Sequence, residues 1–263
     1  MFPLKDNIPT RRFPVLTVAL IVANALMFFF FQEATLSFGG AAIDEQRVVE
    51  FGAIPYEISH PSERCEFGGG DQVLCGSEPG DRGNAPETAP MPVTVLTSMF
   101  MHGGILHLVG NMLFLWIFGN NIEDSMGRLR FIAFYLLGGV IALLAQTAIA
   151  PDSVVPTIGA SGAVAAVLGG YALLYPRARV ITLVFIIFFI TVIELPALLI
   201  LVGWFLLQVF YGSADLAQPL AGGEGGVAYF AHIGGFIFGL IIIKLFANRV
   251  HEDYEIERRV PVY

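Results

Sequence analysis

The chain has 263 residues and a formal net charge of −8, and 56% of its residues are hydrophobic while only 14% are charged. Soluble domains carry about 25% charged residues, so this composition excludes an ordinary soluble globular protein. We therefore predict an integral membrane protein that is surrounded by the lipid bilayer and has no nucleic-acid partner.

Long uncharged runs predict the membrane spans. One helix needs about 20 predominantly apolar residues to cross a bilayer, and runs near this length recur along the chain. They lie at residues 13–31, 105–119, 131–150, 158–175, 180–211 and 227–246. The predicted fold is therefore all-α, a polytopic membrane protein in which six transmembrane helices form one bundle.

These spans set the expected domain organisation. Residues 1–12 form a cytoplasmic N-terminus, residues 13–247 a six-span domain with an outer loop insertion at 32–97, and residues 248–263 a cytoplasmic tail. Within the insertion, residues 61–92 are rich in Gly, Pro and acidic residues and contain both cysteines, which predicts an exposed, partly ordered segment. Its outer location permits a disulfide between Cys65 and Cys75, with two free thiols as the alternative.

The run at 180–211 is too long for one span and contains Glu194-Leu195-Pro196. Because proline is tolerated in the first helical turn, one span from about Pro196 to Tyr211 can follow an interfacial or half-inserted hairpin at 180–193; two short spans are the alternative. With six spans, the inner segments hold 11 of the 14 Lys and Arg residues. This positive-inside bias favours the hairpin, with both termini cytoplasmic.

Ser161 and His232 are polar residues inside apolar runs. Polar groups are costly in hydrocarbon and usually face a protein interior or a water-filled cavity. In the six-span topology both residues lie less than about 10 Å below the outer face, since a helix rises about 1.5 Å per residue. The pair predicts nucleophilic catalysis by a Ser–His dyad without an acidic third member. The alternative for Ser161 is close helix packing among small residues.

A third polar group lies at the same depth, at the start of the second span. His107 and Asn111 are four residues apart, so they share one face of a helix, and both can donate hydrogen bonds to a developing oxyanion. His102 and His107 are five residues apart and would lie on different helical faces, which disfavours a metal site. We expect no metal and no cofactor.

Together these elements resemble the rhomboid family of intramembrane serine proteases, in particular its prokaryotic six-span type. The resemblance rests on His102, His107 and Asn111, on the motif at residues 159–162, and on Ala231-His232 followed by Gly235 and Gly239. It implies that Ser161 is the nucleophile and His232 the general base and acid. It also implies that His107, Asn111 and the Ser161 backbone N–H form an oxyanion hole, and that His102 and Gly159 line the same cavity.

The resemblance further implies what the protein acts on and where. The substrates would be transmembrane helices of other membrane proteins, cleaved near their outer ends, and the location would be a bacterial or archaeal plasma membrane. Some rhomboids carry a tyrosine that stacks on the catalytic histidine, one turn after the serine; this chain has Ala165 there. We therefore expect Tyr229 or Phe236 to pack against His232, with lipid-facing rings as the alternative.

Two other classes of function stay open. One is an inactive relative that binds transmembrane clients, against which the presence of both Ser161 and His232 argues. The other is a small-solute transporter with polar side chains near a cavity, against which the lack of an evident internal repeat argues.

Overall fold

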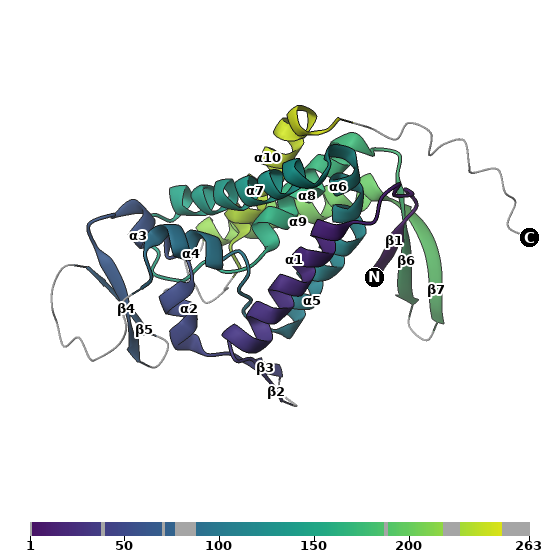
Figure 1. Ribbon diagram of the computed structural model, residues 1–263. Helices are drawn as coiled ribbons and strands as arrows, with labels where there is room; N and C mark the ends of the chain where they lie inside the picture. The colour runs from purple at the N-terminus through teal and green to yellow at the C-terminus, as the bar shows by residue number, and fades with distance from the viewer. Residues whose placement is uncertain are drawn as a thin grey trace, which may run out of the picture.

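The computed structural model describes residues 2–37, 40–69, 72–76, 88–186, 189–217 and 227–248. Apolar helices form a bundle, with a small subdomain at one end and a three-stranded sheet at the other (Figure 1). Of the predicted cytoplasmic tail at 248–263, all residues except Asn248 lie outside the described part.

Six apolar helical segments follow the order of the predicted spans. Four are long and apolar enough to cross a membrane: Ile105–Met126, α7 (Arg128–Ile149), α9 (Ala197–Ala217) and α10 (Tyr229–Phe246). The first of these comprises α5 (Ile105–Phe114), the π-helical turn Leu115–Gly119 and α6 (Asn120–Met126). Two are shorter: α8 (Ser161–Leu174), and Val15–Phe31, which comprises α1 (Val15–Leu26) and the π-helical turn Met27–Phe31. The chain is an integral multi-pass membrane protein built as a helical bundle.

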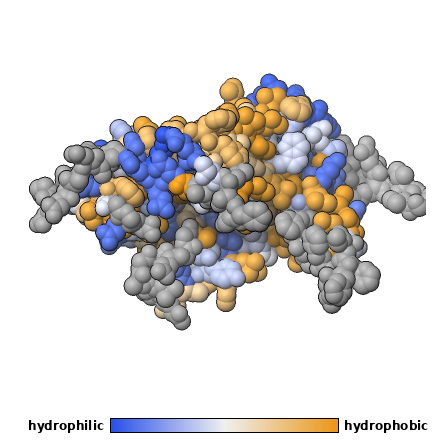
Figure 2. Space-filling model, turned by 90° about the horizontal axis from the view of Figure 1, so that it is seen from below, coloured by the Kyte–Doolittle hydropathy of each residue, from blue (hydrophilic) through white to orange (hydrophobic). Residues whose placement is uncertain are grey.

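Large apolar side chains cover the outside of these helices. Phe210 is 64% exposed, Ile241 66% and Leu245 77%. In Figure 2, hydrophobic groups gather over the middle of the face shown, and hydrophilic groups lie toward its ends. Exposed apolar side chains in a band of this kind are expected where a helix bundle contacts lipid.

The segment before α9 is a β-hairpin, so the fold contains a sheet that the all-α prediction did not include. Strands β6 (Arg179–Ile186) and β7 (Phe189–Pro196) pair antiparallel, and β1 (Phe2–Asp6) pairs with β6. Helix α9 begins at Ala197, directly after Pro196. The predicted hairpin and the predicted start of the fifth helix are therefore confirmed, and the hairpin is extended rather than helical.

Strand β1 is packed into the end of the bundle through Asp6. This side chain is 2% exposed, and its Oδ2 accepts hydrogen bonds from Nδ2 of Asn121 and from the hydroxyl of Tyr171, each at 2.6 Å. Burial raises the pKa of Asp6 from 3.8 to about 7. The predicted N-terminal segment 1–12 thus contributes to the packed structure.

Small residues allow α8 to pack closely against α7 and α10. A Cβ added at Gly162 would overlap the side chain of Ala142 on α7, and one added at Gly239 would overlap the backbone carbonyl of Ala166 on α8. A Cβ at Gly235 would likewise overlap the carbonyl of Gly162. This close approach, typical of small-residue helix contacts in membranes, brings the first turn of α8 beside the first turn of α10.

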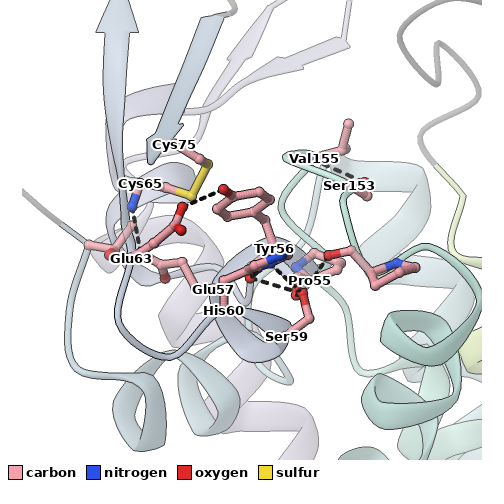
Figure 3. The surroundings of a disulfide bond; sticks show 12 residues. Pro55, Tyr56, Glu57, Ser59, His60, Glu63, Cys65, Cys75, Ser153 and Val155 are labelled. Carbon is pink, nitrogen blue, oxygen red and sulfur yellow. Dashed lines mark hydrogen bonds between the residues drawn. A yellow bond between two sulfur atoms is a disulfide. The ribbon is translucent and has the colours of Figure 1, made fainter. Parts of the chain in front are cut away.

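The predicted outer loop insertion forms a small subdomain in its described part, which we call the outer subdomain after that prediction. It contains β2 (Thr35–Ser37), β3 (Gly40–Ala42), α2 (Glu45–Phe51), α3 (Pro55–Ser59), β4 (Arg64–Gly69), β5 (Gln72–Gly76) and α4 (Met91–Thr97). Strands β4 and β5 form a hairpin that the Cys65–Cys75 disulfide closes, and a carboxylate oxygen of Glu57 accepts the Cys65 backbone N–H at 2.8 Å (Figure 3).

Candidate active site

Ser161 is the first residue of α8, and the loop before it turns sharply to present it. Gly159 has φ +130°, a conformation that favours glycine, and its N–H donates to the carbonyl of Ser98 at 2.8 Å. At the start of a helix the backbone N–H groups have no intrahelical acceptor. The side-chain hydroxyl and the backbone N–H of Ser161 therefore both lie at the N-terminal end of α8.

His232 lies beside Ser161, from the first turn of α10. Its Nε2 is 2.8 Å from the Ser161 Oγ. A hydrogen bond from α7 holds the start of α10 in this position: the side-chain oxygen of Gln146 accepts the backbone N–H of Ala231 at 3.3 Å. The geometry brings together the two residues that sequence analysis selected, although 71 positions separate them in the chain.

The other side of the imidazole contacts α9. Nδ1 of His232 is 2.8 Å from Oε1 of Gln208, and the Trp204 ring lies 5.6 Å from the His232 ring. Phe236 instead stacks on Phe205, and Tyr229 on Tyr211. The expectation that Tyr229 or Phe236 packs against His232 is wrong, because the ring that occupies this position comes from a neighbouring helix.

Sequence analysis did not select Gln208. A signal was present, because an amide inside the apolar run 180–211 is a polar group in a membrane helix. What the run could not reveal was the rotation of α9 about its axis, which decides whether the amide faces His232 or the lipid.

His107 and Asn111 lie on one face of α5, as their spacing predicted. Nδ1 of His107 is 3.4 Å from the backbone N–H of Gly103 and accepts it, which leaves the ring proton on Nε2. The Asn111 side chain is 8% exposed, and its Nδ2 is a buried donor without an acceptor among the described residues. The Nδ2–H groups of Asn111 and the Nε2–H of His107 can therefore donate to a bound ligand.

A cavity of about 670 Å³ joins these groups. Its lining includes Ser161, His232, His107, Asn111 and Gly159. Apart from these polar groups its walls are mostly apolar, so an ionic or hydrogen-bonding contact inside it is screened less than in bulk water.

His102 is the one predicted cavity residue that does not line the cavity. It is fully buried behind His107, with the two rings 5.1 Å apart, and its backbone N–H and carbonyl are both bonded to the Gln32 side chain. Within the described ranges, no three His, Cys, Asp or Glu side chains group as metal ligands. The position of His102 suits it to supporting the ring of His107.

The outer subdomain holds the loop that leads to Ser161. The carbonyl of Ala53 accepts the Thr157 N–H at 2.8 Å, and the carbonyl of Ser153 accepts the Tyr56 N–H at 3.0 Å. Figure 3 shows the α3 residues beside this loop, where the Ser59 hydroxyl donates to the Pro151 carbonyl at 2.6 Å. The loop before Ser161 is therefore held by hydrogen bonds from the outer subdomain and from Ser98, the residue that follows α4.

Comparison with known protein families identifies the family of this chain. The family model described as "Rhomboid domain" matches residues 90–249, which include every residue of the site described above except those of the outer subdomain. The chain belongs to the rhomboid family. This rhomboid therefore comes from a family of intramembrane serine proteases, and the prokaryotic six-span subtype stays a prediction.

Three curated relatives of this rhomboid are named as mitochondrial rhomboid or rhomboid-like proteins. It is 32% identical over 161 residues to presenilin-associated rhomboid-like protein A of Danio rerio, an alignment that covers 59% of this chain and 37% of that one. It is 29% identical over 226 residues to the Mus musculus protein of similar name, covering 84% and 46%. Identity to rhomboid protein 1 of Saccharomyces cerevisiae is 32% over 155 residues, covering 57% and 40%. The chain spans less than half the length of these relatives.

Proposed function

We propose that this rhomboid is an intramembrane serine endopeptidase in which Ser161 and His232 form the catalytic dyad. The observation that carries the proposal is the 2.8 Å contact between Ser161 Oγ and His232 Nε2 in a mostly apolar cavity. We assign the activity to the predicted domain 13–247. Inside the bundle the pair has low-dielectric surroundings, in which a preorganised base and donors act more strongly than in water.

The chemistry follows that of acyl transfer. The Ser161 Oγ attacks the scissile carbonyl carbon while Nε2 of His232 takes its proton, and the carbonyl oxygen becomes an oxyanion. His232 then gives the proton to the leaving amine as the peptide C–N bond breaks. Water attacks the resulting ester with His232 again as base, which releases the new carboxyl end and restores the serine.

Three donors support the oxyanion in this proposal. They are Nε2–H of His107, Nδ2–H of Asn111 and the backbone N–H of Ser161. The unpartnered Nδ2 of Asn111 is the strongest support, since a buried donor without an acceptor costs free energy unless a ligand satisfies it. Such donors count most when they are aimed at the place where charge develops.

The substrate proposed is a transmembrane helix of another membrane protein. A helix hides its carbonyls in backbone hydrogen bonds, so the scissile segment must become extended before Ser161 attacks it, which favours sites rich in helix-destabilising residues. The expected prokaryotic plasma membrane gains no support from relatives named as mitochondrial proteins. We therefore define the cleavage side only by topology, as the side of the outer subdomain.

The decisive experiment is cleavage of a model transmembrane substrate by the purified protein in detergent. Ser161→Ala and His232→Ala should each abolish cleavage, and the double variant should be no worse than either, because the two groups act as a unit. Full activity in either single variant would overturn the dyad. An inactive parent protein that still binds the substrate would indicate a client-binding relative instead.

A further inference from the structure

Gln208 is the residue behind the dyad, on the far side of His232 from Ser161. It belongs to α9, is 8% exposed, and places its Oε1 2.8 Å from Nδ1 of His232. A buried amide in an apolar helix is costly unless its polar atoms are satisfied. The role of this amide therefore follows from its two hydrogen-bond partners, His232 Nδ1 and the Trp204 carbonyl.

The orientation of the Gln208 amide is fixed by its second partner. Its Nε2 donates to the backbone carbonyl of Trp204, one turn earlier in α9, at 3.3 Å. A carbonyl oxygen only accepts, so the reversed amide would set two oxygens against each other. The hydrogen-bond network thus assigns the amide oxygen to the His232 side.

We propose that Gln208 is the positioning residue of the dyad, and that it holds the His232 imidazole with its proton on Nδ1. This inference rests on the proposed function of Ser161 and His232. The amide oxygen accepts only a nitrogen that carries a proton, so Nδ1 is the donor and Nε2 keeps the lone pair that faces Ser161. The other tautomer would place a proton on Nε2 and leave the serine without a base.

The same contact acts again when charge develops. After His232 takes the serine proton, both ring nitrogens are donors, and the Gln208 oxygen continues to accept from Nδ1. Hydrogen bonds to charged groups are stronger than those between neutral groups. Gln208 therefore supplies from α9, as a neutral acceptor, the restraint that a carboxylate supplies in a Ser–His–Asp triad.

The test compares variants that keep or remove the acceptor. Gln208→Met keeps the length of the side chain and removes the oxygen, and Gln208→Glu keeps an oxygen at the same reach. Leu207→Met is the matched control, because this neighbour is 51% exposed on the outside of the same helix. Two rates are measured in detergent: cleavage of the model transmembrane substrate, and labelling of Ser161 by a fluorophosphonate, in which Oγ displaces fluoride from phosphorus.

We expect Gln208→Met to slow labelling and to lower kcat by about 10- to 100-fold at an unchanged KM, as loss of a hydrogen bond to a charged group does. Gln208→Glu should restore most of both rates, and Leu207→Met should match the parent. Parent rates in Gln208→Met, or equal losses in the Met and Glu variants, would overturn the positioning role. Labelling that persists in Ser161→Ala would instead contradict the proposed function.

A second measurement, on the Gln208→Glu variant, tests the inference even if the Gln208→Met variant fails to fold. A carboxylate beside Nδ1 stabilises the protonated imidazole, so the acid limb of the pH–rate profile of Gln208→Glu should move to higher pH. Among the residues that line the cavity, His107 is the other titratable group, and Gln208→Glu leaves it unchanged. An acid limb that coincides with that of the parent would overturn the inference.

Discussion

The backbone of Gly159 faces the ring of His107 so closely that a Cβ on the glycine would lie 2.9 Å from the imidazole Nε2. This nitrogen is one of the proposed oxyanion donors. The glycine thus fixes the distance between the serine loop and α5, and its φ of +130° is one that other residues rarely adopt.

Gly159→Ala should lower cleavage by about 10- to 100-fold, because a methyl group there displaces His107, and a misplacement of about 1 Å in a site can cost about 100-fold. The measurement is kcat for the model substrate in detergent. Gly203→Ala on α9 is the control, since a Cβ at Gly203 would meet no atom within 4 Å and Gly203 does not line the cavity. Equal rates in Gly159→Ala and the parent would show that this close approach is not needed.

Asn111→Ala should reduce kcat while leaving residual activity. Loss of one oxyanion donor typically costs about 2.7–4 kcal/mol of transition-state stabilisation, and the His107 and Ser161 donors remain. Val109→Ala, on the lipid-exposed side of the same helix, should cleave at the parent rate. An Asn111→Ala variant with full kcat would remove this residue from the oxyanion hole.

Stability should fall as pH rises, through Asp6. Its folded pKa of about 7 lies above the ordinary 3.8, so its contribution is fully present below pH 3.8 and is lost as pH rises to about 7. The thermal midpoint in detergent should decrease over this window, and Asp6→Asn should flatten the decrease. Asp215→Asn, which removes an exposed carboxylate, should keep the slope of the parent. An unchanged slope in Asp6→Asn would assign the pH dependence to other groups.

Single cysteines should report the topology when they are labelled with a membrane-impermeant thiol reagent. Cysteines placed at Asp152 and Ser213 should react from the outer side, and cysteines placed at Arg128 and Arg177 should not, because basic residues gather on the inner side. The two natural cysteines are joined in a disulfide and give no background. Outer labelling at Arg177 would contradict the six-span arrangement.

The sequence was most informative where chemistry and hydropathy coincide. Long apolar runs predicted the order of the helical segments, and Pro196 marked the start of α9 to within one residue. Ser161 and His232 stood out because polar groups are rare in such runs, and their common depth followed from the topology alone. These features depend on local composition and on the helical rise, both of which can be read along the chain.

Several other features that depend on contacts between distant segments were not predicted. The apolar stretch of β6 and β7 does not by periodicity distinguish a strand from a buried helix, and its partner β1 lies more than 170 residues earlier. Gln208 and Trp204 reach His232 only because α9 is rotated toward α10. His102 was expected in the cavity, but the chain folds it behind His107.

The hydrogen bonds between the outer subdomain and the loop 151–159 have one more consequence. Ser161 lies at the start of a buried helix, yet Ala53, Tyr56 and Ser59 hold the loop before it from the disulfide-bearing subdomain. A soluble ligand that binds α3 would therefore act on the residues that support the loop before the nucleophile, without entering the bilayer. Inhibition from the aqueous side would not need to compete with a transmembrane helix for the cavity.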